Sequence, residues 1–414
     1  MYGFFNRRLA LQQVVKNCYR SVVQDLENSH LGFIQNARLF PISIKLFSSG
    51  NKEVKSIQSE EYSFTVAYLV NSCGLSPETA KSAAKRVKFE SSEKPDSVLQ
   101  ILKSSGFANT QIAKLIRVRP NILLAHPERS ILPKLEFLKS IGITDAEIAN
   151  VCSSNPAILG QSLENSLIPN YNFLKSVLLS DENVIKTFRK KQRIFNQDLP
   201  KKVSPKLAVL RELGVPESFI ALALTCFPAV VLQAHSNFDE NVKKVIELGF
   251  DPRKCAFIHA MQVFASISQP TREHKLDVLR RWGWSEEDIR LAFRRCPVYL
   301  NSSENKIISG LDFLVNKMGW KSTAIAKYPD TFLMNLEKRV IPRCSVIKVL
   351  QLRGLLKKNL SLGQILGPVE KVFLGRFVTK YGDDIPQLVN IYKCKEDLQS
   401  LDLNCNVSPA TIVC

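Results

Sequence analysis

Arginines and lysines recur in this sequence shortly before a proline, or before the residue that stands in its place, in steps of about 35 residues. Seven of them lie one to three residues ahead of that position: Arg117, Arg119, Lys191, Arg193, Arg294, Arg295 and Lys327. Lys190 adjoins them in a denser cluster between Lys186 and Lys206. Guanidinium and ammonium groups bind phosphate oxygens, so cations at a regular spacing could hold a polyanion. Cations at a helix C-terminus also complement the helix dipole, and this capping role is the alternative.

The basic positions are not filled in every repeat. Thr225-Cys226-Phe227 precedes Pro228 instead, and Ala260-Met261-Gln262 precedes Val263-Phe264, which stand where a further proline would be. Arg193-Ile194 takes the place of the proline in another repeat. Because equivalent positions of stacked repeats line up as a ridge, we expect a discontinuous basic stripe. A further concentration of cations runs from Lys338 to Lys358, and a solvated helix face is its plainer interpretation.

Glycine marks the end of most repeats. The marker glycines, in steps of 34 to 36 residues or twice 36, are Gly106, Gly142, Gly214, Gly249, Gly283, Gly319 and Gly354. Leu178 stands at the one missing mark. Four prolines lie 14 residues after a marker glycine: Pro120, Pro156, Pro228 and Pro297. Self-similarity at this period indicates stacked supersecondary units rather than one globular core.

Each repeat has the pattern of two helices and a bend. Isoleucines eight residues before the proline are expected to be buried anchors of a first helix: Ile112, Ile148, Ile220 and Ile289. The proline ends that helix, and the two or three apolar residues after it predict a short buried turn, of which a 3₁₀ turn is one form. A second helix follows, with Pro133, Pro169 and Pro205 expected in its first turn. The marker glycine fits the left-handed residue that ends this helix. The fold class is therefore an all-α solenoid of seven to eight repeats.

The first 49 residues do not follow the repeat. They hold six basic and two acidic residues, with serines and a scattered apolar face, which is typical of an organellar import signal. We predict a transit peptide over 1–49, a linker over 50–61, the solenoid over 62–392 and a C-terminal tail over 393–414. Mitochondrial import is favoured, with the chloroplast as the competing destination and a cap on the solenoid as the non-targeting alternative.

Catalytic and cofactor motifs are absent from the sequence. It contains no phosphate-binding loop, dinucleotide fingerprint, H-E-x-x-H or G-x-S-x-G. The ten cysteines are scattered singly, so we expect reduced structural thiols and no metal site. The longest apolar run is too short and broken to span a membrane. We therefore expect no enzyme, no cofactor, no small-molecule substrate and no membrane partner. Without residues 1–49, 51 basic and 36 acidic residues remain, a net charge of about +15.

Taken in phase, these residues resemble the mitochondrial transcription termination factor (mTERF) family. The core of the resemblance is the isoleucine eight residues before the proline, the apolar residues after it and a closing Leu-x-x-Leu-x-x-x-Gly. Residues 64–75 and 93–99 are similar to the opening of plant members, and 373–381 with Ile385-Pro386 to their closing segment. The resemblance covers about residues 62–392.

The resemblance implies a curved half-ring of helical repeats that binds nucleic acid in organelles. Duplex mitochondrial DNA, bound to control transcription termination or initiation, is the favoured target. RNA binding for intron splicing or processing is the alternative, and a non-catalytic protein-interaction scaffold is the second alternative. We expect a monomer in solution. The basic residues before the proline are the part of the motif expected to contact phosphates.

Overall fold

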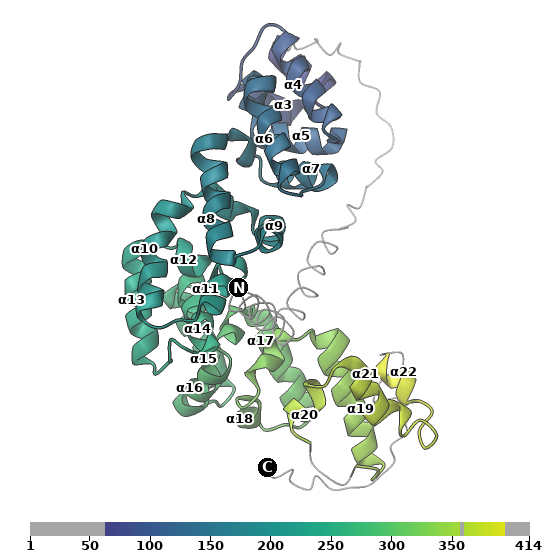
Figure 1. Ribbon diagram of the computed structural model, residues 1–414. Coiled ribbons are helices and arrows are strands. Elements are labelled where there is room, and N and C mark those ends of the chain that lie inside the picture. The colour runs from purple at the N-terminus through teal and green to yellow at the C-terminus, as the bar shows by residue number, and fades with distance from the viewer. Residues whose placement is uncertain (1–62, 357–359, 394–414) are drawn as a thin grey trace, which may run out of the picture. The chain divides into compact units, whose positions relative to one another are not determined.

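The computed structural model describes residues 63–356 and 360–393, which divide into two compact units, with the boundary in the chain between Leu232 and Gln233. The predicted transit peptide, the linker and nearly all of the predicted tail lie outside the described residues. The described part contains helices and turns and no strand (Figure 1). The all-α repeat fold is therefore confirmed, and the half-ring curvature stays a prediction.

The N-terminal unit, 63–232, is built from short helices in pairs. Its α-helices are α2 (Phe64–Asn71), α3 (Pro77–Ala84), α4 (Glu93–Ser104), α5 (Asn109–Val118), α6 (Leu132–Ser140), α7 (Asp145–Ser154), α8 (Ile168–Leu178), α9 (Asp181–Lys190), α10 (Leu199–Glu212), α11 (Glu217–Thr225) and α12 (Ala229–Leu232). Its 3₁₀ turns are η1 (Pro120–Leu124), η3 (Ile158–Gly160) and η5 (Gln192–Asn196), and its π turns are η2 (Pro127–Ile131) and η4 (Leu163–Leu167).

The C-terminal unit, 233–393, repeats the same elements. Its α-helices are α13 (His235–Glu247), α14 (Cys255–Ser266), α15 (Gln269–Arg281), α16 (Glu286–Arg295), α17 (Glu304–Asp312), α18 (Ser322–Ile325), α19 (Ile341–Leu352), α20 (Leu362–Leu366), α21 (Glu370–Phe373) and α22 (Leu388–Tyr392). Its 3₁₀ turns are η6 (Pro297–Asn301) and η8 (Pro329–Leu333), and its π turns are η7 (Phe313–Lys317), η9 (Leu336–Val340) and η10 (Leu374–Thr379).

The marker glycines end the second helices in the left-handed conformation, as predicted. All seven have φ between +71° and +94°, and Gly74, with φ 70°, is an eighth left-handed glycine that the sequence reasoning missed. The apolar residue after the glycine closes the motif: the amide of Phe107, for example, donates to the carbonyl of Leu102 over 3.1 Å. At the missing mark the left-handed residue is Leu179, with φ 53°, one position beyond the predicted Leu178.

The turn after the first helix begins at the proline in several repeats, at Pro120, Pro297 and Pro329. Two expected positions are corrected. In the repeat without proline, the 3₁₀ turn begins at Gln192 rather than at Arg193-Ile194. At Val263-Phe264 no turn forms: α14 continues to Ser266, because no proline interrupts its backbone hydrogen bonds there.

Prolines also shape the second helices. Pro133 and Pro169 lie in the first turn of α6 and α8, as expected, each preceded by a π turn. The proline lacks an amide donor and its ring displaces a carbonyl of the preceding turn, which accounts for the wider turn. Pro205 differs from the expectation, because it lies inside α10 rather than in its first turn.

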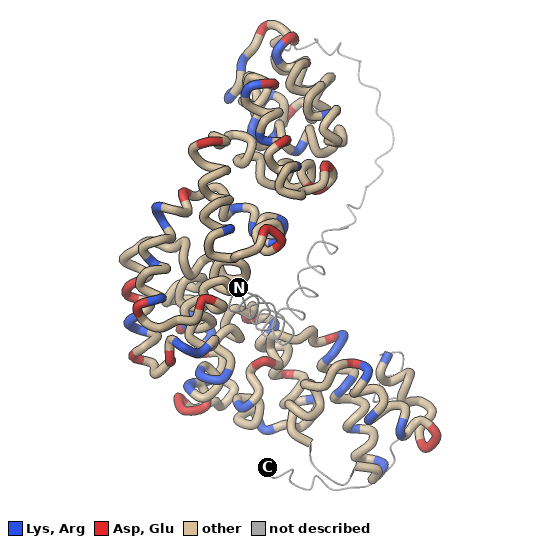
Figure 2. The backbone as a smooth tube through the Cα atoms, viewed as in Figure 1, with Lys and Arg blue, Asp and Glu red and all other residues tan. Residues whose placement is uncertain are grey.

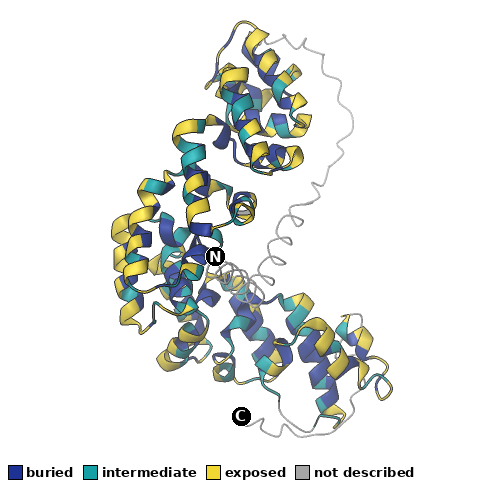
Figure 3. Ribbon diagram, in the orientation of Figure 1, coloured by how far each residue is buried: buried dark blue, intermediate teal, exposed yellow. Residues whose placement is uncertain are grey.

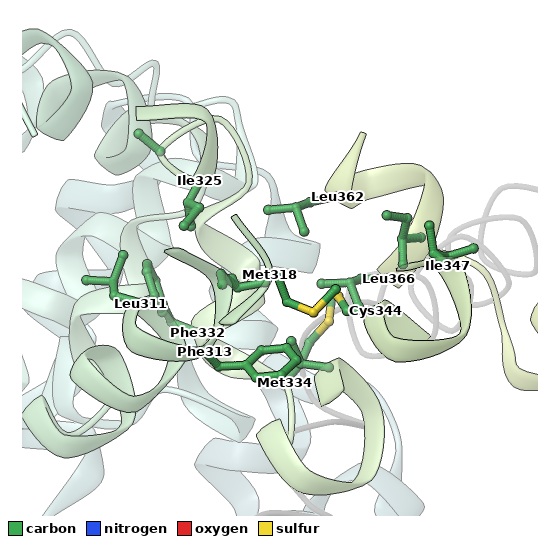
Figure 4. Packing of buried hydrophobic residues seen from close by; sticks show 14 of the residues in the cluster. Leu311, Phe313, Met318, Ile325, Phe332, Met334, Cys344, Ile347, Leu362 and Leu366 are labelled. Atoms are coloured by element: carbon green, nitrogen blue, oxygen red, sulfur yellow. The ribbon is translucent and has the colours of Figure 1, made fainter. Parts of the chain in front are cut away.

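The cores of both units lie between the helices of neighbouring repeats, with the exposed faces outside (Figure 3). The four predicted isoleucine anchors are all buried, Ile220 completely. In the C-terminal unit, Phe313, Phe332, Ile347 and Leu366 belong to one continuous cluster that joins successive repeats (Figure 4). This packing fixes where each first helix ends, and so where its terminal cations lie.

Candidate nucleic-acid interface

In the N-terminal unit, the predicted basic residues lie at the C-terminal ends of two first helices. Arg117 is exposed in the last turn of α5, and Arg119 is the half-buried residue that caps this helix. Lys190 ends α9, and the exposed Lys191 caps it. Arg193 is exposed within the following 3₁₀ turn.

In the C-terminal unit, the same edge of the repeat carries the remaining predicted residues. Arg294 and Arg295 are exposed and are the last two residues of α16. Lys327 is exposed between α18 and the turn that begins at Pro329. Basic and acidic residues are interspersed along both units (Figure 2), so the partners of each cation decide which ones are available.

The corrected turn at Gln192 changes which residues of the repeats are equivalent. Lys191 caps α9 as Arg119 caps α5, so these two share a position. Arg189, and not Lys191, is the counterpart of Arg117. The Arg189 guanidinium forms an ion pair with Glu147 of the preceding repeat, with Nε 2.9 Å from Oε1. The charge of Arg189 is therefore neutralised within the protein.

Six of the predicted cations have neither a carboxylate partner nor a side-chain hydrogen bond among the described residues. We call them the turn-edge cations: Arg117, Arg119, Lys191, Arg193, Arg294 and Lys327. Their positive charge is not neutralised by the parts of the protein that the structure describes. Such residues are free to bind an anion.

Lys103, Lys317 and Arg353, which lie beside marker glycines, have no carboxylate partner among the described residues. Four other cations near the repeat marks are paired with carboxylates. Each lies in the last turn of a second helix and contacts a carboxylate in the first turn of the next helix, six residues on. These glycine-edge pairs are Lys139–Asp145 (2.9 Å), Lys175–Asp181 (3.0 Å), Arg211–Glu217 (2.6 Å) and Arg280–Glu286 (2.6 Å). The hydrogen bond from Arg280 lowers the pKa of the Glu286 carboxyl.

Arg295 has the alternative role considered for these cations, which is to cap the C-terminus of a helix. Its Nη1 donates to the carbonyl oxygen of Lys327 over 2.6 Å, at the end of the next repeat's first helix. Arg86 likewise donates to carbonyls at the end of the next repeat's first helix. Its Nη1 donates to the carbonyl of Val118, 32 residues ahead, over 2.9 Å, and its Nη2 donates to the carbonyl of Arg117 over 2.7 Å. Arg295 thus joins neighbouring repeats, and part of its hydrogen-bonding capacity is used there.

A set of buried cations was missed by the sequence reasoning. Lys134, Lys206 and Lys275 are at most 9% exposed, and each donates from Nζ to a carbonyl 25 residues ahead, over 2.7 to 2.8 Å. The acceptors, at Leu159, Val231 and Leu300, belong to the turn region of the next repeat. Burial lowers the pKa of Lys134 and of Lys275. The recurrence of Lys134 and Lys206 at 72 residues, two repeat periods, was the available signal.

The basic concentration between Lys338 and Lys358 is largely structural. Arg343 is 2% exposed and donates from Nη1 to the carbonyl of Pro368 over 2.6 Å. Arg339 donates to the carbonyl of Leu366, and Lys348 to that of Lys317, over 2.8 Å and 2.7 Å. Lys357 and Lys358 lie outside the described residues. These contacts tie α19 to its neighbours.

The described residues hold no group of three or more His, Cys, Asp or Glu side chains that could bind a metal ion. Cys255 and His259 on α14 are a thiol and an imidazole that lie close together, with Sγ and Nε2 3.6 Å apart. Burial lowers the pKa of His259 to about 4, so its imidazole is neutral at pH 7. No helix in the described part is both long enough and apolar enough to cross a membrane.

The profile of the mTERF family matches residues 99–309 and 255–374, which together cover more than half of the chain. The chain belongs to the mTERF family. It is also similar to "Transcription termination factor MTERF15, mitochondrial" of Arabidopsis thaliana, with 29% identity over 127 residues. That alignment covers 30% of this chain and 27% of the relative. The mTERF proteins are nucleic-acid-binding regulators of organellar gene expression and generally not enzymes.

Proposed function

We propose that this mTERF protein binds duplex mitochondrial DNA through the turn-edge cations and so controls transcription, by termination or initiation. The observation that carries the proposal is the set of cations at first-helix ends without carboxylate partners among the described residues. Membership in a family of nucleic-acid-binding regulators supplies the class of ligand. The name of the A. thaliana relative supports transcription termination and the mitochondrion as the more specific assignment.

The proposed contacts are to phosphates rather than to bases. Lysine and arginine bind the DNA backbone without reading sequence, and each contact releases counterions. The turn-edge cations are interrupted at α7, α11 and α14, which are capped by Asn155, Cys226 and Ile267. We therefore expect separate points of contact with the backbone, with sequence preference set elsewhere.

Binding of the purified chain to a labelled duplex, followed by fluorescence anisotropy at several salt concentrations, tests this function. We expect Lys191→Ala to weaken binding to all duplex sequences and to lower the salt slope by about 0.9. Lys103→Ala is the matched control in the N-terminal unit, because Lys103 is exposed in the last turn of α4, just before Gly106 and not at the end of a first helix. Equal losses in the two variants would contradict the proposal.

Competition identifies the nucleic acid. A structured organellar RNA that displaces the duplex at lower concentration than unlabelled duplex would favour a role in splicing or RNA processing. Binding to neither, with retention of an acidic protein partner, would favour the scaffold role. We expect the duplex to compete best and the protein to remain a monomer in light scattering.

Localisation is tested with the predicted leader. Residues 1–49 lie outside the described part, so the proposal of mitochondrial import rests on their composition and on the name of the relative. A chain lacking residues 1–47 should fail to accumulate in mitochondria. Its continued import, or import of the leader fused to a fluorescent reporter into chloroplasts alone, would contradict the assignment.

A further inference from the structure

Arg119 differs from the other turn-edge cations in how its side chain is held. Its guanidinium lies against the backbone of Gly160, the last residue of the 3₁₀ turn in the next repeat. A Cβ atom built on Gly160 would lie 2.0 Å from Cζ and Nη2 of Arg119 and 2.4 Å from Nη1. Only glycine leaves room for the guanidinium in this place.

The turn that carries Gly160 is itself fixed from within the protein. The buried Lys134 donates from Nζ to the carbonyl oxygen of Leu159, the residue before Gly160, over 2.8 Å. The Lys134 ammonium is also close enough to Arg119 for their charges to repel. Arg119 thus rests on a turn whose position is fixed from within the protein.

The donors of Arg119 are not used within the described part of the protein. No hydrogen bond or ion pair connects its guanidinium to any described residue, and the side chain is only half buried. Arg86 and Arg295 differ from Arg119, because their guanidinium groups donate hydrogen bonds to carbonyls of the next repeat. A side chain that is already held in place loses less conformational entropy when it binds a ligand.

We infer that Gly160 is a positioning residue, which holds the Arg119 guanidinium flat and open to a backbone phosphate of bound nucleic acid. The inference rests on the proposed function and adds a residue that carries no charge. A guanidinium can bind a phosphate with two parallel hydrogen bonds, which requires a defined orientation of its plane. Gly160 supplies that orientation.

The test is Gly160→Ala, measured for duplex binding and thermal unfolding of the full chain. The new methyl group meets the far end of a flexible side chain, so it moves the guanidinium without disturbing the fold. We expect an unchanged unfolding midpoint and an affinity lower by about three- to tenfold, the cost of losing one ordered side chain. Arg119→Ala should lower the affinity about tenfold. The double variant should bind no more weakly than Arg119→Ala.

Gly375→Ala is the matched control, because a Cβ atom at Gly375 meets nothing within 4 Å. The inference is overturned if Gly160→Ala binds as the native chain does, or if the losses of the two single variants multiply in the double variant. It is also overturned if Arg119→Ala has no effect while Arg294→Ala weakens binding, a result that leaves the proposed function intact. If the native chain binds no nucleic acid, both proposals fail.

Discussion

Two sets of cations in these repeats, the glycine-edge pairs and the turn-edge cations, differ in their partners. Beside the marker glycines, Lys139, Lys175, Arg211 and Arg280 each pair with a carboxylate six residues on. At the ends of the first helices, the turn-edge cations have no such partner within the described residues. A surplus of basic residues is therefore a weak guide to a binding surface. The position of a cation in the repeat, and what it touches, shows whether its charge is available.

The largest expected effect concerns the packing beneath both edges. Ile220 is completely buried, so Ile220→Ala should lower the free energy of unfolding by about 2–5 kcal/mol. Because it carries no charge, the salt slope of binding should not change in the folded variant. Chemical denaturation together with binding measurements checks this. A loss below about 0.5 kcal/mol would show that the repeat register is wrong.

The next effect separates buried cations from available ones. Lys206→Met leaves the Val231 carbonyl without its 2.8 Å partner, which should cost about 1–3 kcal/mol of unfolding free energy. Lys201→Met, on the same helix but exposed, serves as the comparison and should change stability little. Duplex binding measured at a temperature where both variants are folded should be unaffected by Lys206→Met. A reduced salt slope in that variant would mean that Lys206 contacts the ligand.

Two neighbouring arginines at the end of α16 allow an available cation to be compared with a capping one. Arg294→Ala should lower duplex affinity about tenfold, since it removes a charged contact with no protein carboxylate to compensate. Arg295→Ala should have the smaller effect on binding, because the Arg295 guanidinium already donates to the Lys327 carbonyl. Anisotropy titrations of both single variants decide the order. The reverse order would show that the capping contact is broken when nucleic acid binds.

The smallest effect is expected at the glycine edge. Arg211→Ala removes an exposed ion pair with Glu217, and such pairs contribute little to stability in water. Its unfolding midpoint should shift near the limit of measurement, and duplex affinity should stay close to that of the native chain. A loss of affinity like that of Arg294→Ala would remove the distinction between the two edges.

Sequence patterns predicted the elements that depend on local backbone chemistry. The residue at the repeat mark adopts a positive φ, which favours glycine, so Gly106 and its equivalents could be assigned from spacing alone. Where the local signal is missing, spacing was less accurate. Leu179 rather than Leu178 adopts the left-handed conformation, and the turn begins at Gln192 rather than two residues later.

The candidate site was less predictable, because the role of a cation depends on contacts between repeats. Lys206 and Arg343 read as surface charges in the sequence, yet each is buried against carbonyls of a neighbouring turn. Gly160 carries no chemistry of its own, and its relation to Arg119 arises only when two repeats stack. Charge and period therefore indicated where in the repeat the unpaired cations lie, while the partners of each residue required the structure.

The most direct test compares two triple variants that remove the same charge. One replaces Arg117, Lys191 and Arg294 by alanine, and the other replaces Lys139, Arg211 and Arg280. The slope of log affinity for duplex DNA against log salt should fall by close to three units in the first, since each phosphate contact contributes about 0.9. In the second the slope should stay as in the native chain. Equal reductions in both variants would contradict the account, because net charge rather than the turn edge would then determine binding.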